Sequence, residues 1–255
     1  MSIGNFEACL AVTAKWEGGW SFHDADRGGR TMYGITQATL GAFLGRPASV
    51  AEIRALTKER AKEIYRKLFW DAIGAEAMPK GVDLACWDWG VNSGAARGKR
   101  AYADVRTKFA KAHEMVKAVC KARYTFFNTI IAKDASQGVF KKGWFRRVAA
   151  IEATGFKWAL AAQGMSPVDI QRQMGAEAAQ AGQQAAKKDK QGTAAGGGAV
   201  ATGGGGAAVA SSWDWQTLIF CGLVVGAISF VAYMAFRAAR IERARATAFM
   251  GAANA

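Results

Sequence analysis

The composition of the chain changes after residue 165, and this change limits what the chain can fold into. Residues 167–191 are rich in Ala, Gln and Lys, whereas residues 192–212 hold eight glycines with Ala, Ser and Thr and almost nothing to bury. A segment without large apolar side chains adds little to a core, and we expect a flexible linker there. The sequence therefore predicts one sizeable core before residue 165, followed by a helix, a linker and a separate C-terminal segment.

The first 165 residues carry the hydrophobic period of helices. Apolar side chains recur there at three- and four-residue spacing, and Ser49-Val-Ala-Glu52 has the spacing of a capping box. The fold class predicted is mainly α, with a short β-hairpin near residues 31–36. The expected helices cover about 3–17, 37–44, 49–56, 58–69, 79–92, 96–132 (broken) and 144–163, and another begins at Pro167.

Glu17 continues the inward face of the first expected helix. Phe6 and Leu10 precede it on that face, and Gly18 with Gly19 should end the helix. Burial and the helix dipole both disfavour a negative charge at such a place. A carboxylic acid that keeps its proton is what a general acid needs to protonate a glycosidic oxygen. The alternative is a helix-terminal glutamate exposed to water.

The loop after Glu17 supplies further candidates. Asp24 and Asp26 lie on a glycine-rich loop that can fold back across the helix end, so that a second carboxylate faces the first. Thr31 begins a short strand and is able to hold a water. The Asp-x-Asp-x-Gly order lacks the later ligands of a calcium loop, and no metal site is predicted.

Two further sets of side chains are candidates for substrate contact. Asp88 and Asn92 lie four residues apart on one helical face and could border a cleft. Equally, Asp88 could be a satisfied buried residue, with Asn92 capping the end of its helix. Trp20 is the tryptophan that we expect to stack on a sugar, since most of the others should belong to the core.

Three groups of residues carry a resemblance to a known family. Glu17-Gly-Gly-Trp20, Asp26-Arg-Gly-Gly-Arg-Thr31 and Tyr33-Gly-Ile-Thr36 are similar to the signature of glycoside hydrolase family 108, the bacterial and phage N-acetylmuramidases. Asp88-Trp-Gly-Val-Asn92-Ser-Gly94 resembles the second block of this family. Phe140-Lys-Lys-Gly-Trp-Phe-Arg-Arg147 resembles the peptidoglycan-binding module that follows it.

The resemblance implies a lysozyme-like enzyme that cleaves the β-1,4 bond between N-acetylmuramic acid and N-acetylglucosamine without a cofactor. It makes Glu17 the catalytic acid, assisted by Asp26 and Thr31, an order that also resembles phage-type lysozymes. His23-Asp24 departs from the usual Asp-Pro of the family, so which aspartate faces the cleft stays open. The substrate-binding residues implied by motif and position together are Trp20, Asp24, Tyr33, Asp88 and Asn92.

The domain organisation follows from these blocks and from the change in composition. We expect a lysozyme-like catalytic region and a helical peptidoglycan-binding module, then an Ala- and Gln-rich helix with the glycine-rich linker, a membrane helix and a basic tail. The corresponding residues are 1–95, 96–165, 166–212, 213–236 and 237–255.

The net charge agrees with a partner of opposite sign. Residues 1–165 hold 26 Lys and Arg against 15 Asp and Glu, and a basic domain is drawn to polyanions. No zinc finger, phosphate-binding loop or RNA-binding aromatic strand is present in the sequence, so nucleic acid is not the expected partner. Peptidoglycan glycan strands, which carry peptide carboxylates, fit the charge.

The C-terminal segment has the pattern of a membrane span. Residues 217–236 are twenty in number and uncharged, which makes a helix of about 30 Å, and Trp213, Trp215 and Tyr233 stand near its ends. Gly222 and Gly226 have the small-residue spacing that suits helix pairing.

The orientation of this span follows from the basic residues after it. Four arginines within residues 237–245 predict a cytoplasmic C-terminus and a periplasmic catalytic domain at the inner membrane. The source is expected to be a phage, or a phage-derived lysis cassette, in a Gram-negative host. Two other functions stay open: a lytic transglycosylase, and a non-catalytic, membrane-tethered wall-binding or secretion-assisting protein.

Overall fold

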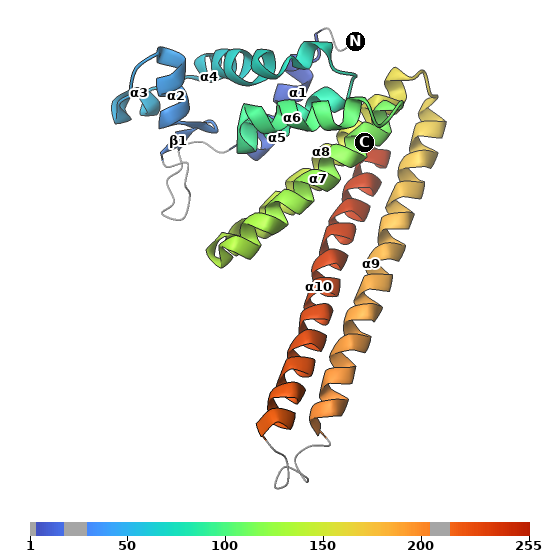
Figure 1. The fold of residues 1–255 in the computed structure, drawn as a ribbon. Helices are drawn as coiled ribbons and strands as arrows, with labels where there is room; N and C mark the ends of the chain where they lie inside the picture. The colour runs from blue at the N-terminus through green and yellow to red at the C-terminus, as the bar shows by residue number, and fades with distance from the viewer. Residues whose placement is uncertain (1–3, 18–29, 205–214) are drawn as a thin grey trace. The chain divides into compact units, whose positions relative to one another are not determined.

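A computed structural model gives the fold of the chain. It describes residues 4–17, 30–204 and 215–255, although not the side chains of 196–204 and 215–225. The chain forms two compact units, Met1–Gln171 and Arg172–Ala255, and each is treated by itself (Figure 1).

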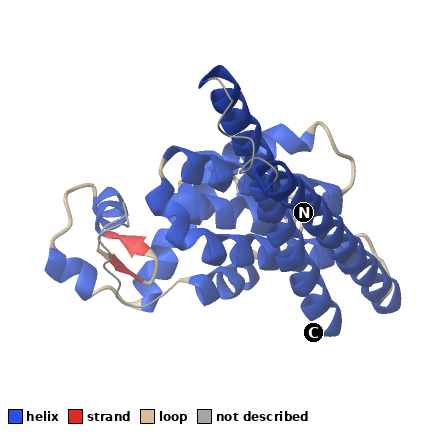
Figure 2. Ribbon diagram, turned by 90° about the horizontal axis from the view of Figure 1, so that it is seen from below, coloured by secondary structure: helices blue, strands red, loops and turns tan. Residues whose placement is uncertain are grey.

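The first unit is helical, with one small antiparallel sheet (Figure 2). In this sheet Thr31 pairs with Thr36, and Met32 pairs with Ile35. The mainly α class with a short hairpin is thereby confirmed. The α-helices and strands are α1 (Phe6–Thr13), β1 (Thr31–Met32), β2 (Ile35–Thr36), α2 (Gln37–Leu44), α3 (Val50–Arg54), α4 (Lys58–Tyr65), α5 (Val82–Ser93), α6 (Ala95–Arg106), α7 (Ala112–Lys133) and α8 (Lys141–Ala162).

Shorter helices join these elements. A π-helical segment, η2 (Arg66–Asp71), extends α4, and the other short segments are the 3₁₀ helices η1 (Ala14–Trp16), η3 (Ala75–Ala77) and η4 (Ala135–Phe140). The expected capping box opens α3, because Ser49 accepts from the backbone of Glu52 at 3.1 Å while Glu52 accepts from the backbone of Ser49 at 2.7 Å.

The core is built around α5, which contacts α1, α6, α7 and α8. Every residue from Val82 to Gly90 is buried, so this helix has no solvent face in its first nine residues. Trp70 and Trp87 pack edge to face with ring centroids 5.8 Å apart, and the ring of Phe6 touches both. The expectation that most tryptophans belong to the core therefore holds for these two.

The first helix ends earlier than the sequence indicates. The α-helical turns of α1 stop at Thr13, and η1 tightens the next three residues. Glu17 follows in an extended conformation, with φ −97° and ψ 124°, as the residue that caps this 3₁₀ turn. The carboxyl group therefore leaves the helix end rather than continuing the helical face, and this turns it toward the sheet and α8.

The second unit contains two long helices. α9 (Pro167–Gly204) begins in the first unit, and α10 (Trp215–Asn254) returns along it. Ion pairs of Arg243 with Asp189 and of Lys188 with Glu242, the latter at 3.0 Å, join the two helices. The part of the predicted flexible linker before residue 205 is helical. Residues 205–212 lie outside the described residues.

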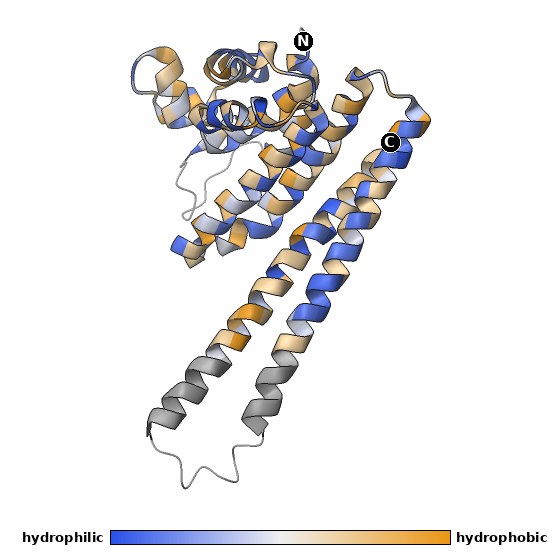
Figure 3. Cartoon of the chain, turned by 45° about the vertical axis from the view of Figure 1, so that its right-hand side comes forward, coloured by the Kyte–Doolittle hydropathy of each residue, from blue (hydrophilic) through white to orange (hydrophobic). Residues whose placement is uncertain are grey.

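The predicted localisation at the inner membrane is wrong. Within 4–17, 30–204 and 215–255, wherever side chains are described, no helix is long and apolar enough to cross a bilayer. The first run of uncharged described side chains in α10 extends from Gly226 to Phe236 and ends at Arg237, and Figure 3 shows this apolar part giving way to hydrophilic residues. This finding overturns the inner-membrane anchor, the periplasmic catalytic domain and the cytoplasmic C-terminus.

Two details explain why the sequence pattern misled. Arg243 and Arg245 have acidic partners, Asp189 and Glu177 on α9, so these charges belong to helix pairing within the unit. Gly226 has nothing within 4 Å of the position where a side chain would begin, so the predicted close helix contact at this residue is not supported. The side chains of 213–225, including Gly222, lie outside the described residues.

Candidate functional site

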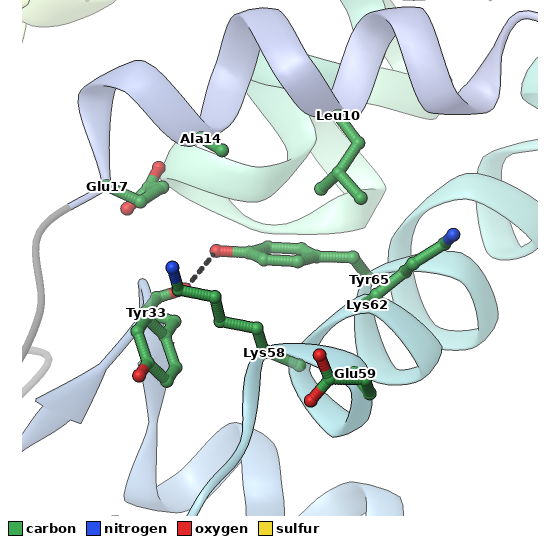
Figure 4. Close-up of a pocket in the computed structure, with 9 residues that line it drawn as sticks. Leu10, Ala14, Glu17, Tyr33, Lys58, Glu59, Lys62 and Tyr65 are labelled. Atoms are coloured by element: carbon green, nitrogen blue, oxygen red, sulfur yellow. Dashed lines mark hydrogen bonds between the residues drawn. The ribbon is translucent and has the colours of Figure 1, made fainter.

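Glu17 lines a pocket between α1, the small sheet and α4 (Figure 4). The pocket has a volume of about 580 Å³, which is in the range of ligand-binding clefts. Its lining combines apolar, aromatic and charged side chains. The residues are Leu10, Ala14, Glu17, Tyr33, Lys58, Glu59, Ala61, Lys62 and Tyr65.

The turn between β1 and β2 forms one wall and depends on an unusual backbone. Tyr33 and Gly34 have φ values of +50° and +74°, in the left-handed region that favours glycine. The hydroxyl of Tyr65 donates to the carbonyl oxygen of Tyr33 at 2.7 Å and fastens the turn to α4. A side chain at position 34 would overlap both this hydroxyl and the Glu17 carboxylate, so glycine is required by conformation and by space.

The Glu17 carboxylate is held from the opposite side by α8. Nη1 of Arg147 donates to Oε1 of Glu17 at 2.7 Å. The side chain of Glu17 is 18% exposed and that of Arg147 is 7% exposed, so this ion pair is largely withdrawn from water. Oε2 is the oxygen that lies toward Gly34 and the turn.

Arg147 is fixed in turn by a buried cluster around Asp88 of α5. The guanidinium of Arg147 donates to Asp88 through Nε at 3.0 Å and Nη2 at 2.8 Å. Arg123 of α7 donates to the same carboxylate at 2.6 Å, and the hydroxyl of Thr13 donates at 2.9 Å. Thr13 and Asp88 have no solvent exposure, and Arg123 has 1%. Four helices thus meet at one carboxylate behind Glu17.

The electrostatics of this cluster follow from two positive charges around one negative charge. Burial alone would raise the pKa of Asp88, but the charges and hydrogen bonds of Arg147 and Arg123 outweigh it and hold the pKa at about 2. Burial would lower the pKa of Arg147, and Asp88 with Glu17 raises it instead. For Arg123, burial is the larger influence and the pKa is lowered.

Tyr65 responds to the same surroundings. Burial first, and the negative charge of Glu17 second, raise the pKa of its phenol, so the hydroxyl keeps its proton at physiological pH. It is therefore a permanent hydrogen-bond donor beside the Glu17 carboxylate.

The structure brings some of the predicted site residues together and separates others. Glu17 and Tyr33 share the pocket. Thr31 starts β1, just before Tyr33, and is half-buried outside the pocket lining. Asp88 is fully buried and touches Arg147 rather than the pocket, so the alternative of a satisfied buried residue describes it. Asn92 lies near the end of α5 and accepts a hydrogen bond from Ser93 at 3.1 Å.

The remaining predicted residues, Trp20, Asp24 and Asp26, lie outside the described residues. Within the described ranges, no group of three or more His, Cys, Asp and Glu side chains is placed to hold a metal ion.

Sequence reasoning missed Arg123, Arg147 and Tyr65. The available signal was Asp88 itself, because a carboxylate buried in a largely apolar helix needs a cation or hydrogen-bond donors as partners. The arginines that pair with Asp88 come from α7 and α8, and no local sequence pattern identifies them.

Comparisons with known proteins point to one family. The sequence model of the family described as glycosyl hydrolase 108 matches residues 10–94. A solved structure of SagA from Brucella abortus is 31% identical, with a TM-score of 0.54, and the match covers 61% of this chain and 96% of SagA. No curated protein matches the chain significantly. With almost the whole of SagA matched at this identity and the family block spanning Glu17 to Asp88, the chain belongs to the glycosyl hydrolase 108 family.

Proposed function

We propose that the chain is an N-acetylmuramidase that cleaves the β-1,4 bond between N-acetylmuramic acid and N-acetylglucosamine, with Glu17 as general acid. Membership of glycosyl hydrolase 108 implies in general an enzyme that hydrolyses peptidoglycan. The observation that carries the finer proposal is the place of Glu17, the carboxyl group at the pocket wall that a buried arginine holds from behind.

The two carboxyl oxygens of Glu17 have different surroundings. Oε1 is bonded to Arg147, while Oε2 lies toward Gly34 at the pocket turn and is the oxygen that we assign to the proton. In the proposed step this proton passes to the glycosidic oxygen as the bond from that oxygen to C1 of N-acetylmuramic acid breaks. A water molecule then supplies hydroxide to C1, and its other proton returns to the carboxylate.

Arg147 has two tasks in this step. Its charge stabilises the carboxylate that remains when Glu17 has given up its proton, in a site that largely excludes water. Asp88 keeps the guanidinium in place when substrate binds, because Nε and Nη2 of Arg147 both donate to the Asp88 carboxylate. Arg147 is thus a positioning residue for Glu17.

Asp26 and Thr31 are proposed to orient the attacking water, as the order of residues in the family signature implies. Thr31 supports this role by its place at the start of β1, the strand that leads into the pocket turn. Under this assignment Asp26→Asn slows turnover more than Asp24→Asn does. The reverse order would give the role to Asp24.

The experiment that tests the proposal replaces the acid alone. Glu17→Gln keeps the hydrogen-bonding shape but cannot donate the proton, and loss of a general acid costs about 10²–10⁴-fold in rate. The rate at which the purified full-length variant clears a peptidoglycan suspension should be at least about 100-fold lower than that of the wild type. Glu63→Gln, an exposed residue paired with Arg60 outside the pocket, is the matched control and should clear the suspension normally. A Glu17→Gln variant within about tenfold of the wild type would remove Glu17 from the role of acid.

A further inference from the structure

The pocket beside Glu17 receives positive charge from α4. Lys58 and Lys62 both line it, one helical turn apart. Lys62 already has a partner, because its Nζ lies 2.7 Å from Oε1 of Glu7. Among the residues that the structure describes, Lys58 makes no ion pair or hydrogen bond through its ammonium group. Of these two lysines, Lys58 is therefore the one whose charge is available to a ligand.

The side chain of Lys58 is also directed toward the reaction centre. Figure 4 shows it extending from α4 toward Tyr33, on the side of the pocket where Glu17 lies, whereas Lys62 points toward the other end. The carboxylate of Glu59 lies away from the Lys58 ammonium in this view. Glu17 is itself neutralised by Arg147. The charge of Lys58 is thus left for a ligand.

We infer that Lys58 binds a carboxylate of the substrate and makes the enzyme prefer peptidoglycan that is negatively charged beside the bond to be cut. This inference rests on the proposed function. Two carboxylates of peptidoglycan have this chemistry: that of the stem peptide, and the lactyl carboxylate of muramic acid when no peptide is attached. A lysine suits either, because its ammonium is a compact charge on a flexible stem with three rotatable donors.

Lys58 is not needed as an ion-pair partner for Glu17, because Arg147 already occupies that position. Arg147 donates to Oε1 at 2.7 Å from a side chain that is 7% exposed, whereas Lys58 is exposed. An ammonium that faces solvent at one end of the pocket gives modest binding rather than catalysis, because water screens it. We therefore expect Lys58 to lower KM for anionic substrate by about three- to tenfold and to leave kcat nearly unchanged.

The test combines substitution of Lys58 with removal of the negative charge of the substrate. Full-length wild type, Lys58→Gln and Lys99→Gln are assayed on native peptidoglycan and on peptidoglycan whose carboxylates have been converted to amides. Lys99 is exposed on α6 outside the pocket and controls for loss of one charge. Amidation should raise KM for wild type and Lys99→Gln by about three- to tenfold. Lys58→Gln should have, on both native and amidated peptidoglycan, the raised KM that the wild type has on amidated peptidoglycan.

A binding measurement separates this inference from the proposed function. The same substitutions are made in the Glu17→Gln background, and co-sedimentation with insoluble peptidoglycan is measured. If wild type releases no sugar, the proposed function fails, while sedimentation still reports on Lys58. If Lys58→Gln and Lys99→Gln have equal KM and equal sedimentation both on native peptidoglycan and on strands stripped of stem peptides, the inference about Lys58 is overturned. Strands stripped of stem peptides assign the source: a Lys58 effect on intact strands identifies the stem carboxylate, and an effect confined to stripped strands identifies the lactyl carboxylate.

Discussion

Asp88 lies entirely out of water and yet carries a full negative charge, because two arginines and a threonine hydroxyl surround it. A buried ion pair contributes little net stability compared with an apolar replacement, but removing one partner leaves an uncompensated charge and costs about 3–5 kcal/mol. The cluster is therefore better understood as a device that fixes the direction of Arg147 than as a source of stability.

The first prediction concerns the pH dependence of this cluster. The folded pKa of Asp88 is lowered from 3.8 to about 2, so its contribution to folding is complete above about pH 4 and is lost as the pH falls toward 2. Asp88→Asn should lower the free energy of unfolding by about 3–5 kcal/mol at pH 7. Urea unfolding should show this difference shrinking between pH 4 and pH 2. A difference that is the same at pH 7 and pH 2.5 would contradict the ionised, doubly paired state of Asp88.

At the scale of elements, the turn between β1 and β2 places a left-handed backbone beside the proposed catalytic acid. Gly34 has a positive φ and lies against both the Glu17 carboxylate and the Tyr65 hydroxyl. Gly45, which ends α2, has nearly the same φ of +71° but has nothing within 4 Å of its missing side chain. A substitution at Gly45 therefore introduces conformational strain alone, whereas a substitution at Gly34 introduces both strain and steric overlap.

Gly45→Ala should cost about 1–2 kcal/mol of stability, the usual cost of a left-handed conformation, and should leave activity intact. Gly34→Ala should cost at least as much and should also displace Glu17, so that kcat falls by about tenfold or more because a misplaced acid is inefficient. Thermal unfolding and peptidoglycan turnover of both variants provide the comparison. Equal activity in the two variants would show that the turn does not position Glu17.

Elements with local signals could be predicted from the sequence. The caps at Ser49 and Pro167 and the apolar periods fixed most helix boundaries closely, and the break between α6 and α7 was expected. Glu17 could be named as a candidate because its motif is local. Arg147 lies 130 residues from Glu17 in the chain, so only the packing of α8 on α5 brings them together. The uncharged run before Arg237 misled because two of the arginines that follow it, Arg243 and Arg245, form ion pairs with α9.

At the scale of the whole molecule, the candidate site is not contained in the part that the family block covers. Residues 10–94 hold Glu17, Tyr65 and Asp88, but both arginines come from α7 and α8. The first compact unit, Met1–Gln171, contains all of them. The predicted boundary between a catalytic region and a binding module at residue 95 remains a prediction, and the site draws on both sides of it.

Truncation tests this dependence. A chain of residues 1–171 should fold cooperatively and hydrolyse peptidoglycan, since it retains the core and the Asp88 cluster. A chain of residues 1–95 should fail to fold, because it leaves Asp88 buried without either arginine and exposes the faces of α5 that α6, α7 and α8 cover. Circular dichroism during heating shows which chain melts cooperatively. An active 1–95 chain would show that α7 and α8 are dispensable.

Hydrolysis with Glu17 as the acid can be tested by the mass of the products formed in ¹⁸O-labelled water. Wild-type protein should release fragments that end in reducing N-acetylmuramic acid carrying one ¹⁸O atom, because water supplies the new hydroxyl group. Glu17→Gln should release at least about 100-fold less. Unlabelled fragments ending in an anhydro sugar, or labelled fragments formed equally fast by the Glu17→Gln variant, would contradict the account.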